Sequence, residues 1–231
     1  MKYNPKNPLQ KYCGQLCNAQ SRAYKVKNDY FDKIDCEDKA YLLGLIFADG
    51  SVSGQRLTLS SKDKKLIEDC KLLLRSDAPV YNYNNHFYLI IGNQKLYNSL
   101  KNLGVMERKS WKEYGIPTLP KHLIRHFLRG FFDGDGSFYI SYHERKYHYL
   151  CASFSCGSRR FLSEIRQWLD GQNIKTHKIR FDNKGDNKGS WQLKMARIEA
   201  IKNFVNLLYD DSHYYLERKF AIVNNYYGGK I

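Results

Sequence analysis

Hydrophobic positions along the chain follow two periodicities, and the same succession of periodicities occurs twice. In the first half, an alternating run at 56–61 is followed by an amphipathic stretch at 62–75, alternating runs at 79–84 and 86–92, and an amphipathic stretch at 93–104. The corresponding runs of the second half lie at 149–156, 158–173, 176–181, 190–196 and 197–209. Period-two alternation predicts strands, and a period near 3.6 predicts helices. The pattern therefore predicts two α+β lobes, each an antiparallel sheet backed by helices.

Each succession begins with a copy of one apolar motif. The segment YLLGLIFADGS at 41–51 recurs as FLRGFFDGDGS at 127–137, so that Asp49 corresponds to Asp135. Both copies are expected to form core helices that end at an acidic residue followed by glycine. The triplet ERK closes the copies at 107–109 and 217–219. The chain is therefore an internal duplication, and we expect its halves to be related by a pseudo-twofold axis.

Small residues on the two motif helices indicate how these helices pack. Gly44 and Ala48 are four residues apart, as are Gly130 and Gly134, so each pair lies on one helix face. Without larger side chains on these faces, two helices can approach backbone to backbone. We therefore expect the lobe interface at Gly44 and Gly130.

Packing of this kind would place the last motif acids, Asp49 and Asp135, side by side. Two close carboxylates repel each other unless a cation lies between them, and divalent ions prefer such oxygen ligands. These ions can activate water and stabilise the oxygens of a phosphodiester undergoing cleavage. The pair of acids therefore predicts a metal-dependent nuclease. A calcium-binding EF-hand loop from Asp133 to Glu144 is disfavoured, because Phe138 stands where that loop needs glycine.

Charge narrows the choice of partner. The chain has 38 Lys and Arg against 23 Asp and Glu, and its net charge of +15 favours a polyanion such as nucleic acid. It has no apolar run of the ~18 residues that cross a membrane, and no signal-peptide core. We therefore expect a soluble intracellular protein of the cytoplasm or an organelle matrix, associated with the nucleoid and not with a membrane.

Zinc sites at Cys13/Cys17, at Cys151/Cys156 or at His122/His126 are disfavoured by spacing or by the lack of a third ligand.

Three regions are expected along the chain. Residues 1–38 lie outside the duplication and are basic, which is typical of either a DNA-contacting arm or a solvated leader. Residues 39–115 form lobe one and end in an interlobe linker, which runs from about Glu107 to Pro120 and in which Gly115, Pro117 and Pro120 break any helix. Residues 116–231 form lobe two and a C-terminal segment.

Alternation also separates the core side of each strand from its open side. Apolar side chains such as Val52, Leu57, Ile140, Phe154 and Phe181 are expected to point inward. The outward side chains are hydroxyl, amide and cationic groups that suit phosphates and base edges. The expected DNA contacts are Ser51, Ser53, Arg56, Thr58, Ser60, Tyr88, Ser137, Tyr139, Ser141, Ser153, Ser155, Lys178, Arg180, Gln192 and Lys194.

The two motifs, LLGLIFADG at 42–50 and LRGFFDGDG at 128–136, resemble the namesake motifs of the double-motif LAGLIDADG homing endonucleases. The resemblance covers residues 39 to 220 and implies two pseudo-twofold-related αββαββα lobes whose sheets form a DNA-binding saddle. It implies Asp49 and Asp135 as catalytic metal ligands, together with the carbonyls of Ala48 and Gly134. Phe47 replaces the first motif acid that is present as Asp133, and we interpret it as a packing residue.

The same resemblance implies a function. A monomer would use Mg²⁺, or another divalent ion such as Mn²⁺, to cut both strands of a long, asymmetric double-stranded DNA site, with Lys194 as an active-site lysine. Two alternatives remain on the same fold: a maturase that binds its host intron RNA, and a DNA-binding regulator that does not cleave.

Overall fold

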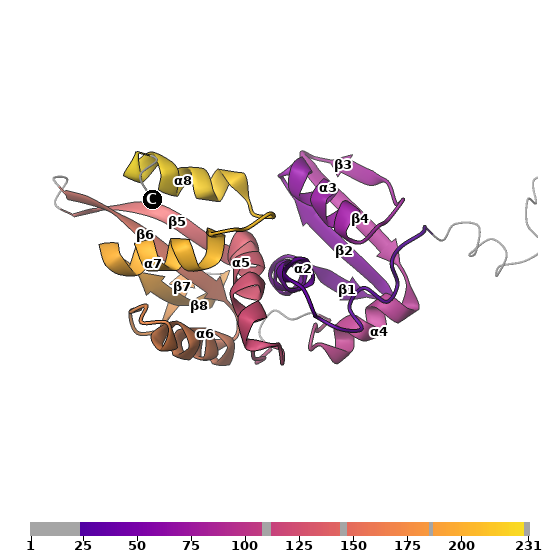
Figure 1. Ribbon diagram of the computed structural model, residues 1–231, viewed down its shortest axis with the longest axis horizontal. Coiled ribbons are helices and arrows are strands. Elements are labelled where there is room, and N and C mark those ends of the chain that lie inside the picture. Colours follow the sequence, from indigo (N-terminus) through magenta and orange to yellow (C-terminus); the bar gives the residue numbers. More distant parts are fainter. Residues whose placement is uncertain (1–23, 108–111, 144–146, 185–186, 229–231) are drawn as a thin grey trace, which may run out of the picture.

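The computed structural model describes residues 24–107, 112–143, 147–184 and 187–228. It consists of two lobes, with helices α2 and α5 lying against each other between them (Figure 1). The elements of lobe one are α2 (Glu37–Ala48), β1 (Ser51–Ser53), β2 (Arg56–Ser61), α3 (Lys64–Leu73), β3 (Val80–Tyr83), β4 (His86–Gly92) and α4 (Gln94–Asn102). Those of lobe two are η1 (Lys121–Leu123), α5 (Ile124–Asp135), β5 (Gly136–His143), β6 (Tyr147–Cys156), α6 (Arg159–Gly171), β7 (Arg180–Lys184), β8 (Asn187–Met195), α7 (Ile198–Tyr209) and α8 (Glu217–Tyr227).

The two sheets have the same topology, which confirms the α+β fold and the duplication. Both are antiparallel and four-stranded, with the order β1-β2-β4-β3 in lobe one and β5-β6-β8-β7 in lobe two. Strands β1 and β5 follow the motif helices directly, where alternation indicated inward and outward side chains at 51–53 and 137–141. Helix α8 is the element that the sequence pattern did not separate from the C-terminal segment.

Alternation predicted most of the core. Val52, Leu57 and Phe154 are buried on the helix-covered sides of the sheets, as expected. The burial that this inward placement implies is wrong for Ile140 and Phe181, which are 38% and 46% exposed. Phe181 lies on β7, the edge strand of its sheet, where its ring packs only edge-on against Trp191. At an edge strand the covering helix ends, so the inner face meets solvent.

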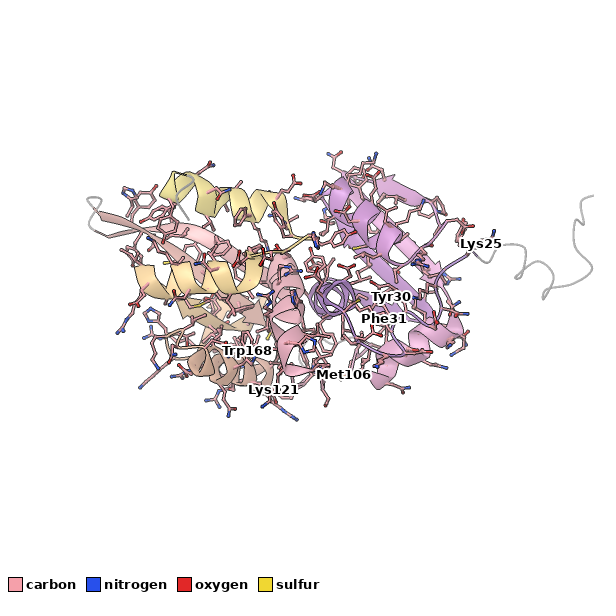
Figure 2. The ribbon with its side chains drawn as sticks, viewed as in Figure 1. Lys25, Tyr30, Phe31, Met106, Lys121 and Trp168 are labelled. Carbon is pink, nitrogen blue, oxygen red and sulfur yellow. The ribbon has the colours of Figure 1, made fainter. Side chains whose placement is uncertain are left out.

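Part of the expected N-terminal arm packs against lobe one. Tyr30, Phe31 and Ile34 are buried in the core, and Figure 2 labels Tyr30 and Phe31 on the lobe-one side of the molecule. The Lys27 amide donates a hydrogen bond to the Leu74 carbonyl at 2.9 Å. Residues 24–36 are thus integrated into lobe one, whereas residues 1–23 of the expected arm lie outside the described residues.

The described part of the interlobe segment, residues 112–120, packs on α6. The amide of Tyr114 donates to the Ser158 hydroxyl at 3.1 Å, and the amide of Ile116 donates to the Glu164 carboxylate at 2.7 Å. These bonds fix the start of lobe two before η1 begins.

Among the described residues, none of the helices combines the length and apolar character that a bilayer crossing requires.

Candidate active site at the lobe junction

The two motif helices touch through their glycines. A Cβ atom built on Gly44 would lie 1.9 Å from the carbonyl oxygen of Phe127, and one built on Gly130 would lie 1.9 Å from the carbonyl oxygen of Tyr41. Both obstacles are backbone atoms of the opposite helix. Helices α2 and α5 therefore meet backbone to backbone, in the reciprocal manner of a pseudo-twofold pair.

The carboxyl-terminal ends of these helices are also adjacent. A Cβ atom on Gly134 would lie 2.3 Å from the Ala48 Cβ and 3.1 Å from Oδ2 of Asp49, which caps α2. Asp135 is the last residue of α5, one position further along. The packing therefore brings the carboxylate of Asp49 to the end of the helix that bears Asp135. Within the described part of the chain, no group of three or more His, Cys, Asp or Glu side chains could hold a metal ion by itself.

Asp133, the first acid of the second motif, is buried and hydrogen-bonded. Its carboxylate accepts hydrogen bonds from the hydroxyls of Tyr41 at 3.0 Å and Tyr209 at 2.9 Å, and from the amide of Leu216 at 2.8 Å. Burial raises the pKa of Asp133 to about 6, although Lys219 and these hydrogen bonds oppose the shift. Tyr41 belongs to lobe one and Tyr209 to lobe two, so Asp133 connects the lobes.

Lys219 is the site residue that the sequence did not indicate as functional. Its side chain is 5% exposed, and its ammonium group donates to the carbonyls of Phe132 and Asp133 at 2.7 Å, of Gly134 at 3.1 Å, and of Gly136. Burial lowers the pKa of Lys219 to about 8, against the opposing effect of nearby carboxylates that include Asp49 and Asp135. The only sequence signal for Lys219 was its place in the repeated ERK triplet.

The equivalent of Asp133 in lobe one is Phe47, which is buried in a cluster of aromatic rings. Its ring centroid lies 5.2 Å from that of Phe127, 6.1 Å from that of Tyr114 and 6.4 Å from that of Phe161. This position is therefore polar and hydrogen-bonded in one lobe and apolar in the other.

His126 has a structural environment and not a metal-binding one. It is buried beside Arg129, whose guanidinium lies 2.9 Å from Nδ1, and Glu37 lies 3.4 Å from the same nitrogen. Burial and the neighbouring arginines lower the pKa of His126 to about 4. Cys151 and Cys156 are free thiols in the structure, whereas Cys13 and Cys17 lie outside the described residues.

The open face of the lobe-two sheet carries a polar hollow. The side chains that line it include Tyr139, Ser141, Lys178, Arg180, Gln192 and Lys194. Ser137 is exposed and Ser155 half-buried near this face. Ser153 differs from expectation, since it is 7% exposed, between Ser137 on β5 and Lys194 on β8. Ser153 is a short side chain on a central strand with a strand on either side and the longer Lys194 beside it, and direct contact between Ser153 and a duplex is therefore disfavoured.

The open face of lobe one carries the other expected contacts. Ser51, Ser53 and Arg56 are exposed there, while Thr58, Ser60 and Tyr88 are half-buried. Strand register pairs Thr58 with both Ser51 and Ile90, just as Ser153 pairs with both Ser137 and Lys194. Ile90 is therefore the lobe-one equivalent of Lys194, and the two faces are chemically unequal.

Comparison with known proteins identifies the fold and the family. A family model described as a LAGLIDADG-like domain matches residues 37–104 and 122–209, which together are more than half of the chain. A reverse gyrase of Methanocaldococcus jannaschii is 29% identical over 137 residues. This match spans 58% of the present chain and 8% of the reverse gyrase.

Several solved structures share the architecture. The complex of I-DmoI with DNA and Ca matches with a TM-score of 0.55 and 18% identity, over 81% of this chain and 97% of that one. I-LtrWI, a LAGLIDADG homing endonuclease bound to target DNA, matches with a TM-score of 0.56 and 15% identity, over 88% and 92%. I-GzeII in complex with its DNA target matches with a TM-score of 0.57 and 11% identity, over 83% and 89%. These likenesses confirm the expected two-lobed fold.

Proposed function

Because this chain belongs to the LAGLIDADG-like domain family, we propose that it is a homing endonuclease that makes a double-strand break in a long, asymmetric DNA site. One observation carries the proposal: the Asp49 carboxylate lies against the end of α5, the helix whose last residue is Asp135. Two acids at a single junction between two sheets suit the cleavage of two strands at one point. Unequal sheet faces suit two unequal half-sites.

The donor atoms at the junction fit a hard divalent ion such as Mg²⁺ or Mn²⁺. Asp49 and Asp135 offer carboxylate oxygens, and the residues immediately before them, Ala48 and Gly134, offer backbone carbonyls at the same helix ends. The Gly134 carbonyl accepts from Lys219 and retains a second lone pair for a metal ion. When bound, such an ion activates water and stabilises the leaving oxygen of the phosphodiester.

Lys194 is proposed to act on the scissile phosphate from lobe two. Its side chain is exposed on the open face of the sheet, at the hollow that also contains Tyr139 and Gln192. An ammonium group in this position can stabilise the negative charge that develops on a phosphate during cleavage. Because lobe one has Ile90 at the equivalent position, a lysine would stabilise the scissile phosphate of only one of the two DNA strands.

The open faces of both sheets are proposed to contact the duplex. The contacts would come from Ser51, Ser53, Arg56, Thr58, Ser60 and Tyr88 in lobe one, and from Ser137, Tyr139, Ser141, Ser155, Lys178, Arg180, Gln192 and Lys194 in lobe two. The hydroxyl and amide groups can read base edges in the major groove, while the cations neutralise phosphates. In lobe two, Gln192 is already oriented by a hydrogen bond of 2.6 Å to Asp182.

The direct test is cleavage of a randomised duplex pool by the purified protein in Mg²⁺. We expect recovery of one family of long, non-palindromic sites cut in both strands. Recovery of no cut site, together with preferential binding of structured RNA over any duplex in competition, would replace the endonuclease by an RNA-binding maturase.

Affinity for the selected target is expected to fall steeply with salt. A protein of net charge +15 that tracks a long duplex displaces many condensed cations. Between 50 and 200 mM salt, we expect the dissociation constant to rise by about 10³-fold or more. Fluorescence anisotropy in a metal-free buffer measures this directly. A change of less than about threefold would show that the excess charge is not used on DNA.

A further inference from the structure

We propose that Lys219 is a positioning residue of the active site, which holds the end of α5 and thereby sets the Asp135 carboxylate in the geometry that binds the metal ion. The inference rests on the proposed endonuclease function. It concerns a residue that lies beyond position 209, where the family model ends. In sequence, the repeat places Lys109 in the corresponding position of the first copy, outside the described residues.

The contacts of Lys219 converge on the end of a single helix. Its ammonium group has three N–H bonds, and four carbonyl oxygens of α5 and the residue after it lie within hydrogen-bonding distance. The last carbonyls of a helix have no partner within the helix, and a cation is favoured at that end of its dipole. Lys219 therefore supplies donors that α5 itself cannot provide.

Two of these acceptors flank the proposed metal ligand. Gly134 and Gly136 are the residues immediately before and after Asp135, and Lys219 binds the carbonyls of both. The backbone of Asp135 is consequently fixed on either side by one buried side chain. The two glycines have no side chains of their own to restrict the backbone, so this restraint comes from outside the motif.

A separate contact fixes α8 to the same helix end. The amide of Leu216, which caps α8, donates to the Asp133 carboxylate at 2.8 Å. The negative charge of Asp133 and the positive charge of Lys219 offset each other close to the junction. Removing both charged groups would leave the net charge around the metal ion unchanged. Any effect of the double substitution on metal binding would then come from a changed position of Asp135.

The test compares Lys219→Met with the double variant Asp133→Asn/Lys219→Met. The single variant leaves the buried Asp133 carboxylate without the compensating Lys219 charge, which can prevent folding. The double variant removes both buried charges and serves as the test in that case. The selected target carries a different dye on each strand. In both variants we expect the strand whose cleavage is most impaired in Asp135→Asn to be cut ~10- to 100-fold more slowly, and the other strand to change by less than about threefold.

Metal binding gives a readout that does not depend on cleavage. Calorimetric titration of Ca²⁺ into the complex with the selected target should show at least one site weakened by about tenfold or more. The matched control is Arg218→Met, which removes the same charge from the adjacent, exposed position of α8. We expect wild-type strand rates and Ca²⁺ affinity for this control.

The outcomes separate this inference from the proposed function. Failure of the wild-type protein to cut any DNA refutes the endonuclease proposal itself. If the wild-type protein cuts both strands, wild-type rates and Ca²⁺ affinity in the double variant would overturn the role of Lys219. Equal slowing of both strands in proportion to a lower melting temperature would overturn it as well, because it would show a merely structural contribution.

Discussion

Replacement of Asp49 or Asp135 by asparagine should abolish double-strand cleavage and leave DNA binding nearly intact. Asparagine keeps the size of the side chain and removes the negative charge that a divalent ion requires. Loss of metal-based stabilisation of the cleaved phosphate costs several kcal/mol in the transition state, so we expect the affected strand to be cut about 10³-fold more slowly. Gel shift and gel-based cleavage on the same labelled target measure the two properties.

The control for this experiment is an acid remote from the junction. Asp170 lies at the end of α6, where it forms ion pairs with Arg166 and Lys175 on the surface. Asp170→Asn should retain wild-type cleavage. A double-strand break made at the wild-type rate by either Asp49→Asn or Asp135→Asn would refute the metal assignment. If either variant failed to bind DNA in a metal-free buffer, the acids would have a structural role and not a metal-binding one.

Adding a single methyl group at the helix contact should destabilise the whole molecule. In Gly44→Ala and Gly130→Ala the new Cβ atom would lie 1.9 Å from a carbonyl oxygen of the opposite helix. The obstacle is backbone in both cases, so no side-chain rotation can relieve the clash and the helices must separate. We expect the free energy of unfolding to fall by about 3 kcal/mol or more, at the upper end of typical overpacking. Melting temperature would then drop by roughly 6–12 °C.

Cleavage should suffer more than stability in the same variants. The helices that separate at Gly44 and Gly130 also place Asp49 and Asp135, and a displacement of about 1 Å at reacting groups can lower the rate ~100-fold. Gly171→Ala is the matched control, because a Cβ atom on Gly171 meets nothing within 4 Å. Wild-type melting and cleavage in both junction variants would be incompatible with the observed contact of α2 and α5.

Features that depend on near neighbours in the chain could be predicted. Helix and strand periodicities and the acid at the end of each motif helix arise from residues a few positions apart, and the duplication shows as the repetition of such a local pattern. The same local patterns placed Val52, Leu57 and Phe154 in the core. Glycine spacing indicated which faces of the motif helices touch, because a missing side chain leaves only the backbone to make contact.

Features that depend on distant parts of the chain were decided only by the tertiary structure. The exposure of Phe181 follows from the position of β7 at a sheet edge, and the burial of Ser153 follows from its place on a central strand beside the longer Lys194. Lys219 is far from Asp133 in sequence, and it reaches the end of α5 only because the chain beyond α7 returns to that point. Sequence alone determined the kind of lobe and the pair of acids. Which buried groups hold those acids in place was set by the packing of α8, since side-chain periodicity contains no information on where a distant helix docks.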